Sequence, residues 1–97
     1  MKEKLLKIIE HYGEEKQLKY IHTEYFELDE AILNYWNDET YYEEVERNDK
    51  EHIAEEIADV MVMLKQFQYN HEITDEQIES IMNYKIDRQL ERIKNEK

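Results

Sequence analysis

Apolar residues recur along this chain with the period of an α-helix. In the stretch from residue 52 to residue 69 they form a seam whose members are separated by steps of four and three: Ile53, Ile57, Val60, Leu64 and Phe67. This spacing places the side chains along one side of a helix. The other sides are also largely apolar, and such a helix is usually buried. The pattern therefore predicts a central, buried helix.

A second stripe on this helix carries two acids. This stripe lies beside the apolar seam and contains Glu56 and Asp59 together with His52, Met63 and Gln66. Residues three apart share a helix face, so the two carboxylates are expected one turn from each other. Buried charges are costly unless they are paired, protonated or bound to a metal. These acids are therefore the first candidates for a functional site.

Residues 14–36 repeat this arrangement on an earlier predicted helix. Its apolar seam again steps by three and four: Leu18, Ile21, Tyr25, Leu28, Ile32 and Tyr35. Glu24 and Glu27 are three apart and lie on the neighbouring stripe. If the two helices pack antiparallel through their seams, all four carboxylates converge.

Local sequence signals place the end of the first helix and the start of the third. A helix is predicted over residues 2–12, and Gly13, the single glycine, is expected to end it. Residues 37–48 are polar and acidic, which predicts a loop or a short helical excursion. Asn48 and Glu51 then have the spacing of a capping box, which places the start of the third helix.

A fourth helix follows the capping-box residues Thr74 and Gln77. We therefore predict one all-α domain over residues 1–97 with a four-helix, bundle-like fold. It comprises a short first helix, two acidic motif helices and a basic last helix. A chain of this length buries a modest share of its surface, so association through a helical face would add useful burial.

The composition excludes several classes of function. The net charge is −12, which argues against binding to a nucleic-acid strand. No cysteine is present, so no disulfide or thiolate metal site is expected. The apolar runs are too short to span a membrane and the first residues lack a signal-peptide pattern, so we expect a cytoplasmic protein. An anionic substrate would need help from divalent cations.

The paired acids fit a hard cation such as Mg²⁺ or Mn²⁺, which prefers carboxylate oxygens. Acids three apart also arise by chance in a chain with 25 Asp and Glu residues, as at Glu76 and Glu79. The residues that flank the acids distinguish a metal site from a chance spacing, since surface acids rarely lie inside an apolar run such as residues 58–64. Neither a di-iron nor a zinc motif is present. The four histidines are therefore expected at the surface or at partner contacts.

Basic and aromatic residues offer further candidates. Lys85, Arg88 and Arg92 form a stripe beside the apolar side of the fourth helix. They are suited to phosphate contact, or alternatively to pairing with neighbouring acids. Trp36 could stack on a nucleobase, or belong to the core or an interface.

Together these residues resemble a known family. Glu24-x-x-Glu27 followed by Glu56-x-x-Asp59 is similar to the Glu-x-x-Glu … Glu-x-x-Asp signature of the MazG-like, all-α nucleotide pyrophosphohydrolases. The resemblance runs from about residue 12 to residue 92. It includes Tyr12-Gly13 with Gln17-Leu18, then residues 27–32, 52–66 and 85–92.

The resemblance implies a Mg²⁺-dependent hydrolase, with Mn²⁺ as a substitute, that splits a nucleoside triphosphate into a monophosphate and pyrophosphate. It implies that Glu24, Glu27, Glu56 and Asp59 are the metal ligands. One acid of the first motif, Glu24 in our hypothesis, would also position or deprotonate the attacking water. Lys85 and Arg88 would steady the phosphates, and the chain would form a homodimer or homotetramer.

A non-enzymatic function is the competing interpretation. A small, very acidic helical protein could act as a regulator or inhibitor that binds a basic protein partner. That hypothesis predicts acids spread over the surface. The enzyme hypothesis predicts acids that point inward and meet.

Overall fold

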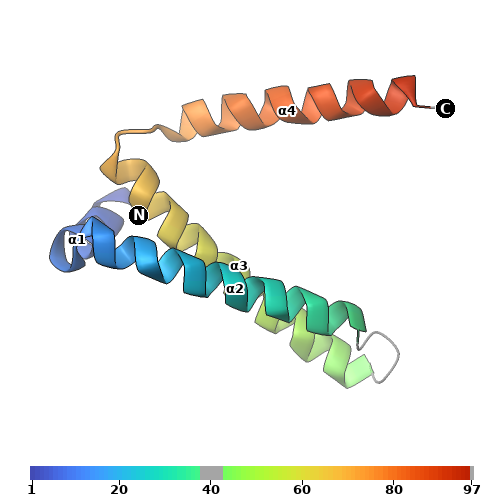
Figure 1. Ribbon diagram of the computed structural model, residues 1–97, viewed down its shortest axis with the longest axis horizontal. Helices are drawn as coiled ribbons and strands as arrows, with labels where there is room; N and C mark the ends of the chain where they lie inside the picture. The colour runs from blue at the N-terminus through green and yellow to red at the C-terminus, as the bar shows by residue number, and fades with distance from the viewer. Residues whose placement is uncertain (38–42, 97) are drawn as a thin grey trace.

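Four helices make up the described part of the chain, and three of them pack together (Figure 1). The computed structural model describes residues 1–37 and 43–96. The helices are α1 (Lys2–Tyr12), α2 (Glu14–Asn37), α3 (Glu43–Asn70) and α4 (Asp75–Asn95). The prediction of an all-α, bundle-like domain of four helices is confirmed.

Helix α1 packs its apolar side mainly against α3 and to a lesser extent against α2. Leu5 and Ile9 are its buried residues and lie one turn apart. The helix ends at Gly13, whose φ of 87° favours glycine and whose N–H donates to the Ile9 carbonyl at 2.8 Å. The predicted end of this helix is therefore confirmed, and α2 begins at the next residue.

Helices α2 and α3 run antiparallel and side by side (Figure 1). Gln17 and Ala31 are the buried residues of α2, and α3 buries a stripe that includes Glu56, Val60 and Met63. These residues form the contact stripe between the two helices. The small side chain of Ala31 leaves room for α3 at this contact.

The predicted packing through the two apolar seams is only partly correct for a single chain. Leu18, Tyr25 and Ile32 of α2 remain exposed by 39–64%. On α3, Ile57 and Leu64 are exposed by 42% and 52%. The contact is shifted toward the acid-bearing stripes, which face each other, and of the predicted seams Val60 is buried while the other members are half-buried or exposed.

Helix α3 begins earlier than the sequence predicted. It is helical from Glu43, so the capping-box spacing of Asn48 and Glu51 falls inside the helix. Residues 37–48 were predicted to be a loop or a short helical excursion; Asn37 is the last residue of α2, and residues 43–48 are helical and continuous with α3. The part over residues 38–42, which includes Tyr41 and Tyr42, lies outside the described residues.

A tight turn joins α3 to α4. The N–H of Ile73 donates to the Gln68 carbonyl at 3.0 Å and the N–H of Glu72 to the Tyr69 carbonyl at 3.1 Å. This is a Schellman-type ending, in which Glu72 takes the left-handed conformation with φ 58°. The predicted capping box of Thr74 and Gln77 is present at the start of α4.

Helix α4 extends away from the other three helices (Figure 1). Among the described residues it packs along its length against no other helix, and it buries none of its own residues. The radius of gyration is 17.2 Å. A compact chain of this length would have a radius of gyration of about 12.5 Å.

None of the described helices is both long and apolar enough to span a bilayer.

Candidate metal centre

Helices α2 and α3 bring together three of the four predicted acidic ligands. Glu24 and Glu27 lie one turn apart on α2, and Glu56 faces them from α3. One carboxylate oxygen of each residue lies within 4.8 Å of the others. The prediction that acids of both helices converge is thus confirmed for this cluster, which we call the acid triad.

Two oxygens of the acid triad are buried and have no hydrogen-bond partner. They are Oε2 of Glu24 and Oε2 of Glu56. Glu56 as a whole residue is only 9% exposed. A buried carboxylate oxygen without a donor is costly. An all-oxygen set of this kind suits Mg²⁺ or Mn²⁺, which would replace the missing donors.

Burial and mutual repulsion make Glu24 and Glu56 harder to ionise. Burial raises the pKa of Glu24, and the charges of Glu27, Asp59 and Glu56 raise it further. Burial also raises the pKa of Glu56, together with the charge of Glu27, whereas His52 acts in the opposite direction. A bound divalent cation reverses this effect, because it favours the charged carboxylates.

Asp59, the fourth predicted ligand, lies near the acid triad but outside it. Its side chain is exposed, and the close group comprises only Glu24, Glu27 and Glu56. Its negative charge still raises the pKa of both Glu24 and Glu56. The structure therefore keeps Asp59 within electrostatic reach of the triad, one turn of α3 beyond Glu56.

A hollow of about 410 Å³ opens beside the acid triad. It is lined by Glu27, Glu30, Ala31, Asn34, His52 and Glu56. Nε2 of His52 lies 3.8 Å from Oε1 of Glu56. From its sequence His52 is expected at the surface or at a partner contact, and it is exposed and also lines this hollow; Asn34 had no predicted role. The spacing of four residues between His52 and Glu56 was the available signal, because it places both on one side of α3.

The other predicted substrate contacts are not brought to this hollow within one chain. Lys85 and Arg88 lie on α4, which packs against neither α2 nor α3. The Arg88 guanidinium instead lies 5.8 Å from the centre of the Tyr84 ring. Trp36 is 69% exposed and does not line the hollow.

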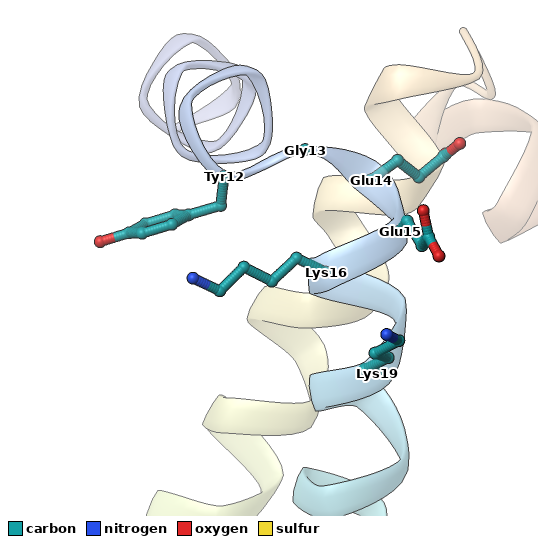
Figure 2. A pocket seen from close by; sticks show the side chains of 6 residues that line it. All are labelled: Tyr12, Gly13, Glu14, Glu15, Lys16 and Lys19. Atoms are coloured by element: carbon teal, nitrogen blue, oxygen red, sulfur yellow. The ribbon is translucent and has the colours of Figure 1, made fainter.

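A second hollow, of about 530 Å³, lies at the junction of α1 and α2 (Figure 2). The Lys16 and Tyr12 side chains extend in the same direction there, with Nζ 5.1 Å from the ring centre, while Glu14 points the opposite way. Glu14 is already engaged by Asn70 and His71. This hollow contains no predicted site residue and no converging set of ligands.

No protein-family model, no curated protein and no solved structure matches this chain. The acid triad is therefore the feature of the described residues from which a function is inferred. The triad combines three carboxylates, two buried oxygens without a hydrogen-bond partner and an adjacent polar hollow.

Proposed function

We propose that this chain is a Mg²⁺-dependent nucleoside triphosphate pyrophosphohydrolase that resembles the MazG-like group. The observation that supports it best is the pair of buried, unpartnered oxygens on Glu24 and Glu56 within the acid triad. A cation is the simplest group that compensates such oxygens, and a triphosphate is a ligand that a cation can attract to a protein of charge −12.

In this proposal Glu24, Glu27 and Glu56 hold the cation, and Asp59 adds its charge from the edge of the site. A bound Mg²⁺ polarises phosphate oxygens and lowers the pKa of a coordinated water. Asp59 is exposed and lies one turn of α3 beyond Glu56. Its assignment as a ligand remains a prediction.

Hydrolysis adds water across the anhydride between the α and β phosphates and yields a nucleoside monophosphate and pyrophosphate. Glu24 is our candidate for the residue that positions this water or takes its proton. Its place in the acid triad supports that role, because a water bound to a cation held there would lie beside its carboxylate. Glu27, one turn away, is the second catalytic candidate.

The hollow beside the triad is the candidate place for the rest of the substrate. Asn34 offers both a donor and an acceptor there, and His52 offers a donor near Glu56. Lys85, Arg88 and Trp36 remain predictions as substrate contacts, since none of them lines this hollow in one chain.

A turnover panel tests the proposal. The eight common ribo- and deoxyribonucleoside triphosphates are incubated with Mg²⁺ and the products are resolved by ion exchange. We expect monophosphate and pyrophosphate from the wild type and none from Glu56→Gln. The matched control is Glu79→Gln, which removes an exposed acid of the same spacing from α4 and should keep full activity.

The other outcomes separate the alternatives. Diphosphate and phosphate as products would mean that the cleaved bond is misassigned. Equal loss in both variants would mean that bulk charge, and not the acid triad, supports turnover. A folded protein that gives no product and does not respond to metal would favour the acidic regulator that binds a basic partner.

A further inference from the structure

The hollow beside the acid triad has two ends that differ in chemistry. Glu27 and Glu56 line one end and belong to the triad. Glu30 and Asn34 line the hollow further along α2, and neither belongs to the triad. Because a helix rises about 1.5 Å per residue, Glu30 lies about 4.5 Å beyond Glu27 along the axis of α2, and Asn34 about 10 Å beyond it. The hollow therefore leads away from the acids that are the candidate ligands of the cation.

The charge at the far end of the hollow is unsuited to a phosphate. Glu30 is exposed and is not one of the acids that lie close enough to share a cation. Among the described residues, no lysine or arginine lines this hollow. A phosphate beside Glu30 would be repelled without compensation, whereas a neutral group that donates hydrogen bonds would be attracted. The phosphates of a nucleotide therefore belong at the triad, and its base belongs at Glu30 and Asn34.

The size and the lining of the hollow fit a nucleotide in this orientation. Its volume of about 410 Å³ is in the range of ligand pockets. Ala31 also lines the hollow and offers a small apolar surface on which a planar ring can rest. The distance along α2 from Glu27 to Asn34 is comparable to the reach of a nucleotide from its phosphates to the edge of its base.

Glu30 and Asn34 present a specific pattern of hydrogen-bonding groups. They are four residues apart on α2, so their side chains are neighbours on one side of the helix. The Glu30 carboxylate offers two acceptor oxygens and no donor, and the Asn34 amide group offers a donor. Together they present two adjacent acceptors followed by one donor.

Guanine is the common base whose edge complements this pattern. Its N1–H and N2–H₂ groups are adjacent donors, and its O6 atom next to them is an acceptor. Adenine and cytosine each place a ring-nitrogen lone pair beside their amino group, and uracil and thymine place carbonyl oxygens on both sides of a single N–H. With each of these bases, a lone pair would face an oxygen of the carboxylate.

We propose that Glu30 and Asn34 select guanine nucleotides as the substrate. Both carboxylate oxygens of Glu30 accept hydrogen bonds, one from N1–H and one from N2–H₂, and Nδ2 of Asn34 donates to O6. This inference rests on the proposed function, which is what brings a nucleotide to the hollow, and it names the substrate class of that function.

Binding of analogues that resist cleavage tests the proposal without turnover. The α,β-methylene analogues of GTP, ITP, ATP, CTP and UTP are titrated into the wild type with Mg²⁺ and followed by calorimetry. The inosine analogue lacks only the N2 amino group and so removes one donor to Glu30. We expect the guanine analogue to bind about tenfold tighter than the adenine, cytosine and uracil analogues, with the inosine analogue between them.

Three variants assign the preference to particular residues. Glu30→Ala should bind the guanine and inosine analogues equally, because the N2 amino group has lost its acceptor. Asn34→Asp replaces the donor to O6 by an acceptor and should lose the preference for guanine. The matched control is Asp29→Ala, which removes the same charge from an exposed neighbour that does not line the hollow and should keep the preference. Circular dichroism verifies that each variant retains its helices.

The other outcomes overturn the proposal or separate it from the proposed reaction. Equal binding of all analogues, tighter binding of another base, or no binding of the guanine analogue at millimolar concentration would each overturn it. A guanine preference that survives both Glu30→Ala and Asn34→Asp would do the same. Selective binding of guanine without turnover of GTP or dGTP would support the base contacts and contradict the hydrolase. Turnover without any base preference would support the hydrolase and overturn the base contacts.

Discussion

The side-chain amide of Gln17 donates a hydrogen bond of 2.7 Å to Oε1 of Gln66 in the buried space between α2 and α3. Gln66 is only 2% exposed. The bond joins the two helices two turns of α2 away from Glu24. It therefore favours the register that places the acids of α2 opposite Glu56.

Removal of one partner of this bond should destabilise the protein. Gln17→Ala leaves the buried Gln66 oxygen unsatisfied, and we expect the free energy of unfolding to fall by about 1–3 kcal/mol in urea titrations. Lys19→Ala, at an exposed position of the same helix, should change it by less than about 0.5 kcal/mol. Equal effects of the two substitutions would show that the bond contributes nothing. Replacement of both Gln17 and Gln66 by Leu should be nearly neutral.

Replacement of Glu72 by glycine should stabilise the protein. Its φ of 58° is unfavourable for a residue with a Cβ atom, and glycine adopts this conformation readily. We expect Glu72→Gly to raise the free energy of unfolding by about 0.5–1 kcal/mol. Glu72→Ala is the control, because it removes the same charge and keeps the strain. Chemical denaturation of the wild type and the two variants measures this difference. The explanation is refuted if Glu72→Ala stabilises the protein as much as Glu72→Gly does.

The raised pKa values of Glu24 and Glu56 predict how stability depends on pH without metal. An acid with a raised folded-state pKa binds its proton more tightly in the folded than in the unfolded chain. Stability therefore falls as pH rises from the ordinary glutamate value of 4.5 through the raised pKa. The pKa values of Asp75 and Glu14 are lowered, so their contributions change only at lower pH.

Melting temperatures in EDTA between pH 4.5 and pH 8 measure this effect. We expect the wild type to lose stability over the lower part of that range. Glu24→Gln should lose less stability over the same range, and its melting temperature should be higher than that of the wild type at neutral pH. Glu79→Gln should follow the wild type. A Glu24→Gln protein that melts lower than the wild type at neutral pH would show that the ionised carboxylate is not under strain.

The sequence predicted the convergence of acids because the spacing of Glu24, Glu27 and Glu56 is a local property of two helices. It did not predict which stripe each helix buries. A helix that packs within its own chain and one that awaits another surface have the same apolar period. The residues of the open seam, such as Tyr25 and Leu64, therefore could not be distinguished from core residues before the contact stripe was known.

The ends of the helices show the same limit. Gly13 and Thr74 were predicted correctly, because a left-handed residue and a capping box each depend on a few adjacent residues. The Asn48–Glu51 spacing has the same form and lies inside α3. A capping box marks a helix start only where the preceding residues leave the helix, and that is not encoded by the box itself.

Direct binding of Mn²⁺ tests whether the acid triad holds a divalent cation. Calorimetric titration of the wild type should give a saturable site, and Glu56→Gln should abolish it while Glu79→Gln retains it. At ten times the dissociation constant, the metal should stabilise the wild type by about 1.4 kcal/mol. Equal binding by the wild type and Glu56→Gln, or no binding at millimolar metal by the folded wild type, would contradict the metal centre.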